Sequence, residues 1–269
     1  MTEKVGGSAA RWGPLFGARA AAWAETWEGP TGWGTPVYEH VLERAPIGPG
    51  TRVLDCGCGA GRFTDMAARR GARVAGIDAS KELVEIASAR VPAAEFRTGD
   101  IEALPWEDDA FDVVTGFSVF QFADDKERAL HEAARVSRSL VAVVIPIRAP
   151  ESGIAAVFKP VLPLYTEDAL AGLRESGIFA LSEPGKLDAI LAAAELTPRD
   201  DDEVECPVTF FDADAAERAF MGAGPMQLAI ATSGESAVVA AVRAGLEPFI
   251  QSNGSVVLGG LFRAVIATG

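Results

Sequence analysis

Residues 53–61 read Val-Leu-Asp-Cys-Gly-Cys-Gly-Ala-Gly, and this stretch decides the fold. An apolar run ends in Asp55, glycines follow at Gly57, Gly59 and Gly61, and a helical pattern then begins. The pattern predicts a strand, a tight turn and the start of a helix. Glycine permits a positive φ and leaves room for a ligand against the backbone, and the amides at the helix start point into the same space. We therefore predict a small-ligand site at this turn.

The spacing of the glycines separates this turn from the dinucleotide fingerprint. The pattern G-x-G-x-x-G needs a glycine at position 62, where the chain has Arg62. The next strand, over residues 73–78, ends in Asp78, a carboxylate suited to a ribose diol. A third strand ends before Asp100 and Ile101, which are suited to the edge and the face of an adenine ring. This order predicts an adenosyl ligand, and a nicotinamide oxidoreductase stays an alternative that tight NAD binding would support.

Four ordered segments resemble the class I S-adenosylmethionine-dependent methyltransferases, and most of all the type 11 subgroup related to the ubiquinone and menaquinone C-methyltransferases. In chain order, the segments are VLDCGCGAGR (53–62), GIDAS (76–80), GDIEALPWEDDAFDVVTGFSVFQF (99–122) and the helix and strand that follow. The resemblance covers residues 40–148 well, and residues 149–269 match in general layout. It implies S-adenosyl-L-methionine as the cofactor, held by Asp55, Gly57, Cys58, Gly59, Gly61, Asp78, Ala79, Asp100, Ile101 and Phe117.

The alternation of strands and helices predicts an α/β fold with a doubly wound, mostly parallel sheet. The resemblance implies seven strands in that sheet, within a single domain. We expect an N-terminal helical arm over 1–45, a cofactor-binding half over 46–148, a helical cap inserted after the fifth strand over 149–184, and the C-terminal part of the sheet over 185–269. By resemblance, the arm folds over the cofactor and helps to close the substrate pocket.

The C-terminal part has weaker patterns. We expect an acidic turn at 200–203 followed by a strand through Val208. Helices over about 212–221 and 235–249 and a closing strand over 256–267 complete the prediction.

Composition narrows the class of ligand. The chain has 269 residues, a net charge of −14 and a pI near 4.6, and it is 49% hydrophobic and 23% charged. Nucleic-acid surfaces need clustered cations, so a small-molecule substrate is favoured and no nucleic-acid partner is expected. The three cysteines do not form a disulfide framework. The sequence shows no signal-like segment and no apolar run long enough for a membrane span, so we expect the cytoplasm. The small share of lysine among the cations is typical of high-GC bacterial genomes.

The sequence does not identify a catalytic base. His131 shares a helix face with charged residues, and His40 lies beside a buried stripe, so neither is predicted to be catalytic. The residues after the fourth strand, 116–119, read Gly-Phe-Ser-Val and lack the tetrad that captures an amine. No cluster resembles a magnesium site, and no metal is expected. The catalytic residues are left unknown.

Aromatic residues are the candidates for the acceptor pocket. Phe117, Phe120 and Phe122 follow the fourth strand, Tyr165 lies in the cap segment and Trp33 in the arm. We assign Trp33, Phe120 and Tyr165 to the substrate pocket and leave Phe122 to the core. An apolar pocket fits a hydrophobic acceptor such as a polyketide, quinone or terpenoid.

The sequence thus predicts a methyltransferase for a small, hydrophobic acceptor, with C- or O-methylation in specialised metabolism or quinone-like chemistry. The alternative is a protein that binds S-adenosylmethionine without methylating, as a cyclase-type enzyme or an assembly partner. The missing base and the unusual C-terminal third of the chain keep this alternative open.

Overall fold

The computed structural model describes residues 7–147 and 152–269. The start of the expected arm, residues 1–6, and the start of the expected cap, residues 149–151, lie outside the described residues.

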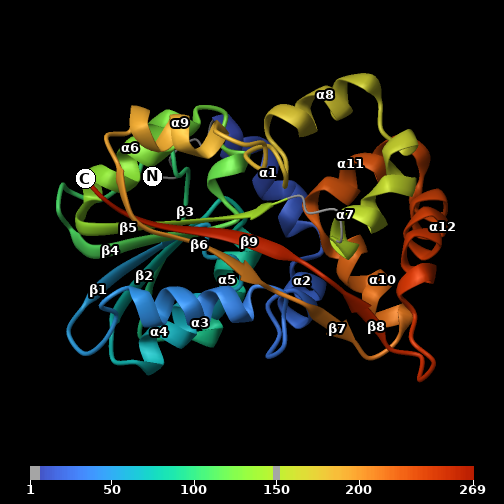
Figure 1. Ribbon diagram of the computed structural model, residues 1–269, viewed down its shortest axis with the longest axis horizontal. Coiled ribbons are helices and arrows are strands. Elements are labelled where there is room, and N and C mark those ends of the chain that lie inside the picture. Colours follow the sequence, from blue (N-terminus) through green and yellow to red (C-terminus); the bar gives the residue numbers. More distant parts are fainter. Residues whose placement is uncertain (1–6, 148–151) are drawn as a thin grey trace.

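A seven-stranded sheet runs through the centre of the molecule in the order β3-β2-β1-β4-β5-β9-β6 (Figure 1). Strands β1 to β5 are parallel, and β9 pairs antiparallel with both β5 and β6. This confirms the predicted doubly wound, mostly parallel sheet. The strands are β1 (Arg52–Cys56), β2 (Arg73–Asp78), β3 (Glu95–Thr98), β4 (Phe111–Phe117), β5 (Ser137–Ile147), β6 (Thr197–Glu205) and β9 (Leu261–Thr268).

Helices cover both faces of this sheet, as its apolar strands require (Figure 1). On one face, α3 (Thr35–Arg44) and α4 (Arg62–Arg69) share a hydrophobic core with β1, β4 and β5. On the other, α6 (Lys126–Val136) and α9 (Lys186–Ala193) share a second core with the same strands. Helix α5 (Lys81–Arg90) follows β2 and packs on the arm helices α1 (Gly7–Gly17) and α2 (Ala20–Thr26).

A helical lobe lies beside the carboxyl ends of the parallel strands (Figure 1). After β5 come α7 (Gly153–Phe158), the 3₁₀ helix η2 (Lys159–Leu164) and α8 (Glu167–Glu175), where the sequence predicted a cap. Three further helices lie between β6 and β9. Two of them pack on α7 or η2 and the third packs on those two, so the lobe is built from two separate segments of the chain. The three helices are α10 (Ala213–Gly222), α11 (Gly224–Ser233) and α12 (Glu235–Leu246), next to a two-stranded sheet of β7 (Val208–Phe210) and β8 (Val256–Leu258).

Two local predictions were wrong. The acidic residues 200–203 are part of β6 rather than a turn. Their carboxylates find cationic partners there: Asp200 and Asp202 lie beside Arg44 of α3. Asp201 lies 2.7 Å from Arg263 on β9. The predicted closing strand is divided into β8 and β9, with residues 259 and 260 between them. Trp33 packs against this break, since a Cβ at Gly260 would lie 2.1 Å from Trp33 Nε1.

Over the described residues, none of the helices has both the length and the apolar character of a membrane span. The same part of the chain holds no group of three or more His, Cys, Asp and Glu side chains suited to a metal ion.

The central position of β1 gives a prediction for stability. Leu54 is 0% exposed at the middle of β1, so Leu54→Ala should lower the free energy of unfolding by about 2–5 kcal/mol through lost burial and the cavity left behind. Urea denaturation followed by circular dichroism measures this. Leu162 is 44% exposed, and Leu162→Ala should change stability by about 0.5 kcal/mol or less. Equal effects of the two substitutions would contradict the assignment of β1 to the core.

Candidate functional site

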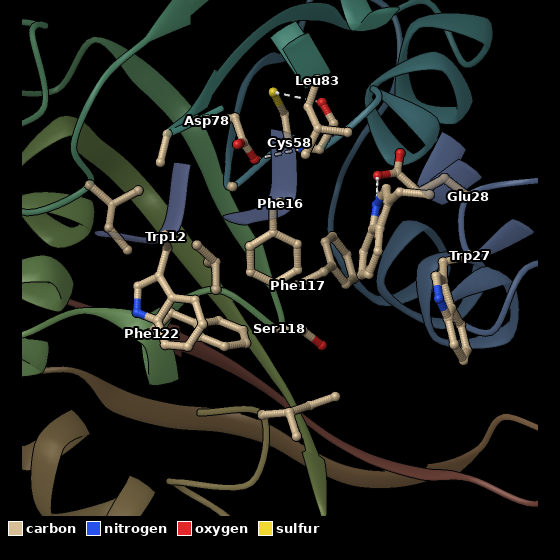
Figure 2. A pocket seen from close by; sticks show the side chains of 18 of the residues that line it. Trp12, Phe16, Trp27, Glu28, Cys58, Asp78, Leu83, Phe117, Ser118 and Phe122 are labelled. Carbon is tan, nitrogen blue, oxygen red and sulfur yellow. Dashed lines mark hydrogen bonds between the residues drawn. The ribbon is translucent and has the colours of Figure 1, made fainter. Parts of the chain in front are cut away.

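A cavity of about 1360 Å³, including its open mouth, lies where the carboxyl ends of β1, β2 and β4 meet the arm and the helical lobe (Figure 2). Ligands of doubly wound sheets bind at such strand ends, next to the point where the strand order reverses. Nine of the ten predicted cofactor residues line this cavity: Asp55, Gly57, Cys58, Gly59, Asp78, Ala79, Asp100, Ile101 and Phe117.

The glycine turn forms one wall of the cavity. Gly57, Gly59 and Gly61 have φ of 65°, 55° and 80°, which is the left-handed region where a side chain is strained. A Cβ at Gly57 would also lie 2.3 Å from a methyl of Val119. Gly61 does not line the cavity: it is the N-cap of α4 and packs on Ala87 of α5. Its role in the structure is therefore to place the helix.

Asp78 ties the end of β2 to this turn. Its Oδ2 accepts a hydrogen bond from Gly59 N at 2.9 Å, and its Oδ1 accepts one from Ser80 N at 2.8 Å. Burial raises the pKa of this carboxyl, while these amide donors lower it. Each oxygen keeps acceptor capacity toward the cavity, because an ionised carboxylate offers about four lone-pair sites.

Asp100, the predicted purine acid, also anchors the arm. Its Oδ1 accepts a hydrogen bond from Glu102 N at 3.0 Å, and a further bond comes from the backbone amide of Ala9 in α1. Ile101 beside it is 7% exposed and lines the cavity. Helix α1 also crosses the end of β2 closely, because a Cβ at Gly13 would lie 2.4 Å from the carbonyl oxygen of Ala79.

Asp55 lies at the floor of the cavity and is 3% exposed. Its carboxyl accepts hydrogen bonds from Thr64 on α4 at 2.9 Å and from Thr115 on β4 at 3.1 Å. Burial raises its pKa from 3.8 to about 7, against the lowering effect of the two threonines. Asp55 thus joins β1, β4 and α4 below the turn. Cys58 is buried as well, and burial keeps its thiol protonated by raising its pKa.

Aromatic rings form the opposite end of the cavity. Phe117, at the end of β4, packs between Tyr38 and Phe63 with centroid distances of 4.6 and 4.5 Å. Trp33 lines the cavity as predicted, is 8% exposed, and lies 4.5 Å from the ring of Phe262.

The structure does not bring Phe120 and Tyr165 to the cavity. Phe120 is 1% exposed and turned into the core below the sheet, where its ring covers Gly116. Tyr165 is 7% exposed inside the helical lobe, and burial raises its pKa. Phe122, which we predicted to lie in the core, lines the cavity instead (Figure 2). Its ring centroid lies 4.8 Å from that of Trp12.

The arm supplies several cavity residues that sequence reasoning did not assign. These are Ser8, Ala9, Trp12, Phe16, Trp23, Trp27, Glu28, Gly34, Val37 and Tyr38. The near-helical spacing of the arm's aromatic residues indicated a buried face, but not what that face covers. Nothing in the sequence around Glu28 marks it as a site residue.

Glu28 binds backbone amides of the turn that we expected to be free for a ligand. The amides of Ala60 and Arg62, which we expected to face a ligand, donate to the Glu28 carboxylate at 2.8 and 3.1 Å. The start of α4 is therefore occupied by a side chain of the arm.

Neither histidine lies at the cavity. His40 faces Asp202 at the sheet edge, with Nε2 and Oδ2 3.2 Å apart, and His131 is exposed on α6. Among the described cavity-lining residues there are four carboxylates, Glu28, Asp55, Asp78 and Asp100, and no Lys, Arg or His. The described lining therefore has acidic groups and no cation, which favours a ligand that carries positive groups.

Comparisons with known proteins agree with this geometry. Residues 54–145 match the model of the methyltransferase domain family, which confirms the expected resemblance over that part of the chain. Over 102 residues the chain is 37% identical to a malonyl-[acyl-carrier protein] O-methyltransferase of Serratia marcescens, covering 38% of this chain and 40% of that protein. Over 117 residues it is 33% identical to the demethylmenaquinone methyltransferase of Thermotoga maritima, covering 43% and 49%. The chain thus matches less than half the length of these curated relatives.

A solved structure shares the fold. The geranyl diphosphate C-methyltransferase of Streptomyces coelicolor, in complex with S-adenosylhomocysteine, aligns with a TM-score of 0.52 and 14% identity. The alignment covers 87% of this chain and 78% of that one. At this identity the likeness shows the fold alone.

The buried Asp55 carboxyl gives a pH prediction. Its pKa in the folded state is above the unfolded value, so its contribution to stability is complete below about pH 4 and is lost as pH rises to about 7. Asp55→Asn should remove this dependence. Over that window the wild type should lose stability relative to the variant by at most about 1.4 kcal/mol per pH unit.

Urea denaturation at pH 4, 5, 6, 7 and 8 measures this difference. Asp168→Asn, which changes an exposed carboxyl on α8, is the matched control and should follow the wild type at every pH. A constant difference between wild type and Asp55→Asn would contradict a raised pKa.

Proposed function

Because residues 54–145 belong to the methyltransferase domain family, we propose that this protein is an S-adenosylmethionine-dependent methyltransferase acting on a small, hydrophobic molecule. One observation supports this proposal most directly. The glycine turn, Asp78, Asp100 and Ile101 follow successive strands and line the same cavity, which aromatic residues line as well.

The cavity residues fit this cofactor. Asp78 and Asp100 retain acceptor capacity for a ribose and an adenine edge, with the apolar Ala79 and Ile101 beside them. Four carboxylates without a lining cation suit the positive sulfonium and ammonium groups. The bound cofactor supplies an already activated methyl group, so the protein has to position the acceptor and exclude water.

The aromatic end is assigned to the acceptor. Trp12, Trp33, Phe117 and Phe122 offer flat apolar surfaces, and Ser118 and Tyr38 are the hydroxyl-bearing residues at this end. Such a chamber suits a quinone-like, polyketide or terpenoid molecule methylated at carbon or oxygen. The demethylmenaquinone methyltransferase among the relatives supports an acceptor of this class.

The absence of a histidine or lysine from the described lining favours an acceptor that is acidic enough to lose its proton without a strong base. The same absence favours, as a second candidate, a protein that holds the cofactor without transferring its methyl group. The free thiols of Cys56, Cys58 and Cys206 suit a reducing compartment, and we place the protein in the cytoplasm.

Two measurements test the proposal. Titration calorimetry with purified protein should show binding of S-adenosylmethionine and S-adenosylhomocysteine, and no binding of either would contradict the proposed function. Incubation with methyl-labelled cofactor and a panel of quinols, phenols and β-keto esters should transfer label to an extractable product. Cofactor binding without transfer to any acceptor in the panel would favour the second candidate.

The predicted ribose acid gives a sharper test. Asp78→Ala should weaken S-adenosylmethionine binding by roughly 1–3 kcal/mol, because a charged acceptor and the tie to Gly59 are lost together. Calorimetry measures this change, and Asp168→Ala on α8 serves as a control that should leave the affinity unchanged. Equal affinity of the Asp78→Ala variant and the wild type would mean that the nucleoside binds elsewhere.

A further inference from the structure

Glu28 connects the arm to the glycine turn. It is 6% exposed and lines the cavity (Figure 2). Its Oε1 accepts hydrogen bonds from Trp23 Nε1 at 2.6 Å and from Ala60 N at 2.8 Å. Its Oε2 accepts one from Arg62 N at 3.1 Å and lies 3.5 Å from Nη1 of Arg90. The acceptor capacity of this carboxylate is therefore used by the protein itself.

The carboxylate lies directly on the bare backbone of the turn. A Cβ at Gly59 would lie 2.0 Å from Glu28 Oε1, so no space is left between them. Paired amides at a helix start, with the positive end of the helix dipole behind them, are the usual binding place for a phosphate. Here the amides of Ala60 and Arg62 have the Glu28 carboxylate in that place, with Arg90 as a countercharge.

We infer that Glu28 is a specificity-determining residue: as a built-in anion at the start of α4, it excludes the diphosphate of a nucleotide and restricts the cavity to adenosyl ligands without phosphate. This inference rests on the proposed function, because it names the feature that separates S-adenosylmethionine from dinucleotides at the same site. A diphosphate entering the cavity would displace a buried, fully paired carboxylate and would face Asp78 as well.

Removing the carboxylate tests this role. Glu28→Ala frees both amides and leaves Arg90 without its countercharge, which creates an anion site beside the adenosine-binding end. The probes are adenosine diphosphate and inorganic pyrophosphate, measured by calorimetry against the wild type. Glu28→Ala should bind both at least about tenfold more tightly than the wild type does, as expected for charge-assisted hydrogen bonds to a phosphate.

Glu85→Ala is the matched control. It truncates an exposed glutamate on α5 that pairs with Lys81 at 3.5 Å and does not line the cavity. It should leave the affinities for adenosine diphosphate and pyrophosphate at the wild-type level. If Glu28 had only a structural role, Glu28→Ala would weaken S-adenosylmethionine binding and would not raise the affinity for either phosphate ligand.

Circular dichroism and cooperative thermal unfolding establish whether Glu28→Ala folds. If it does not, Glu28→Gln decides: it keeps the volume, loses the charge, and should raise the affinity for adenosine diphosphate at least about threefold. A folded variant with wild-type affinity for both phosphate ligands overturns the inference. Failure of the wild type to bind S-adenosylmethionine would overturn the proposed function instead, and the phosphate titrations would still report on Glu28.

Discussion

The hydrogen bond from Gly59 N to Asp78 is the interaction on which the site depends. It joins the turn after β1 to the end of β2 and fixes the turn in a conformation that glycine adopts without strain. Below it, Asp55 joins the same turn to β4 and α4 through two threonines. Buried carboxyl groups thus hold the strand ends together.

The arm is the second part of the site rather than an addition to it. It meets the strand ends at three places: Ala9 on Asp100, Gly13 on Ala79, and Glu28 on the glycine turn. Each contact lies at the strand ends, and aromatic residues of the arm line the same cavity.

The sheet and the cofactor end could be predicted from sequence because their signals are local. Glycines at alternate positions, and an acid at the end of an apolar strand, carry their meaning within a few residues. The residues of the acceptor end could not be predicted from sequence, because this end is made by contacts between distant segments. Phe120 and Phe122 are two residues apart, yet one enters the core and the other the cavity. Helix α11 was missed because its apolar residues follow no single face. Glu28 was missed because the amides that it binds on the turn, those of Ala60 and Arg62, lie more than thirty positions away in the sequence.

A crystal structure of the full chain with S-adenosylhomocysteine tests the central claim most directly. We expect the adenosine at the ends of β2 and β3, against Asp78 and Ile101, with the thioether directed toward Phe117 and with Glu28 still on the turn. A nucleoside bound outside these strand ends, or a cavity that stays closed by the arm while the ligand binds elsewhere, would contradict it.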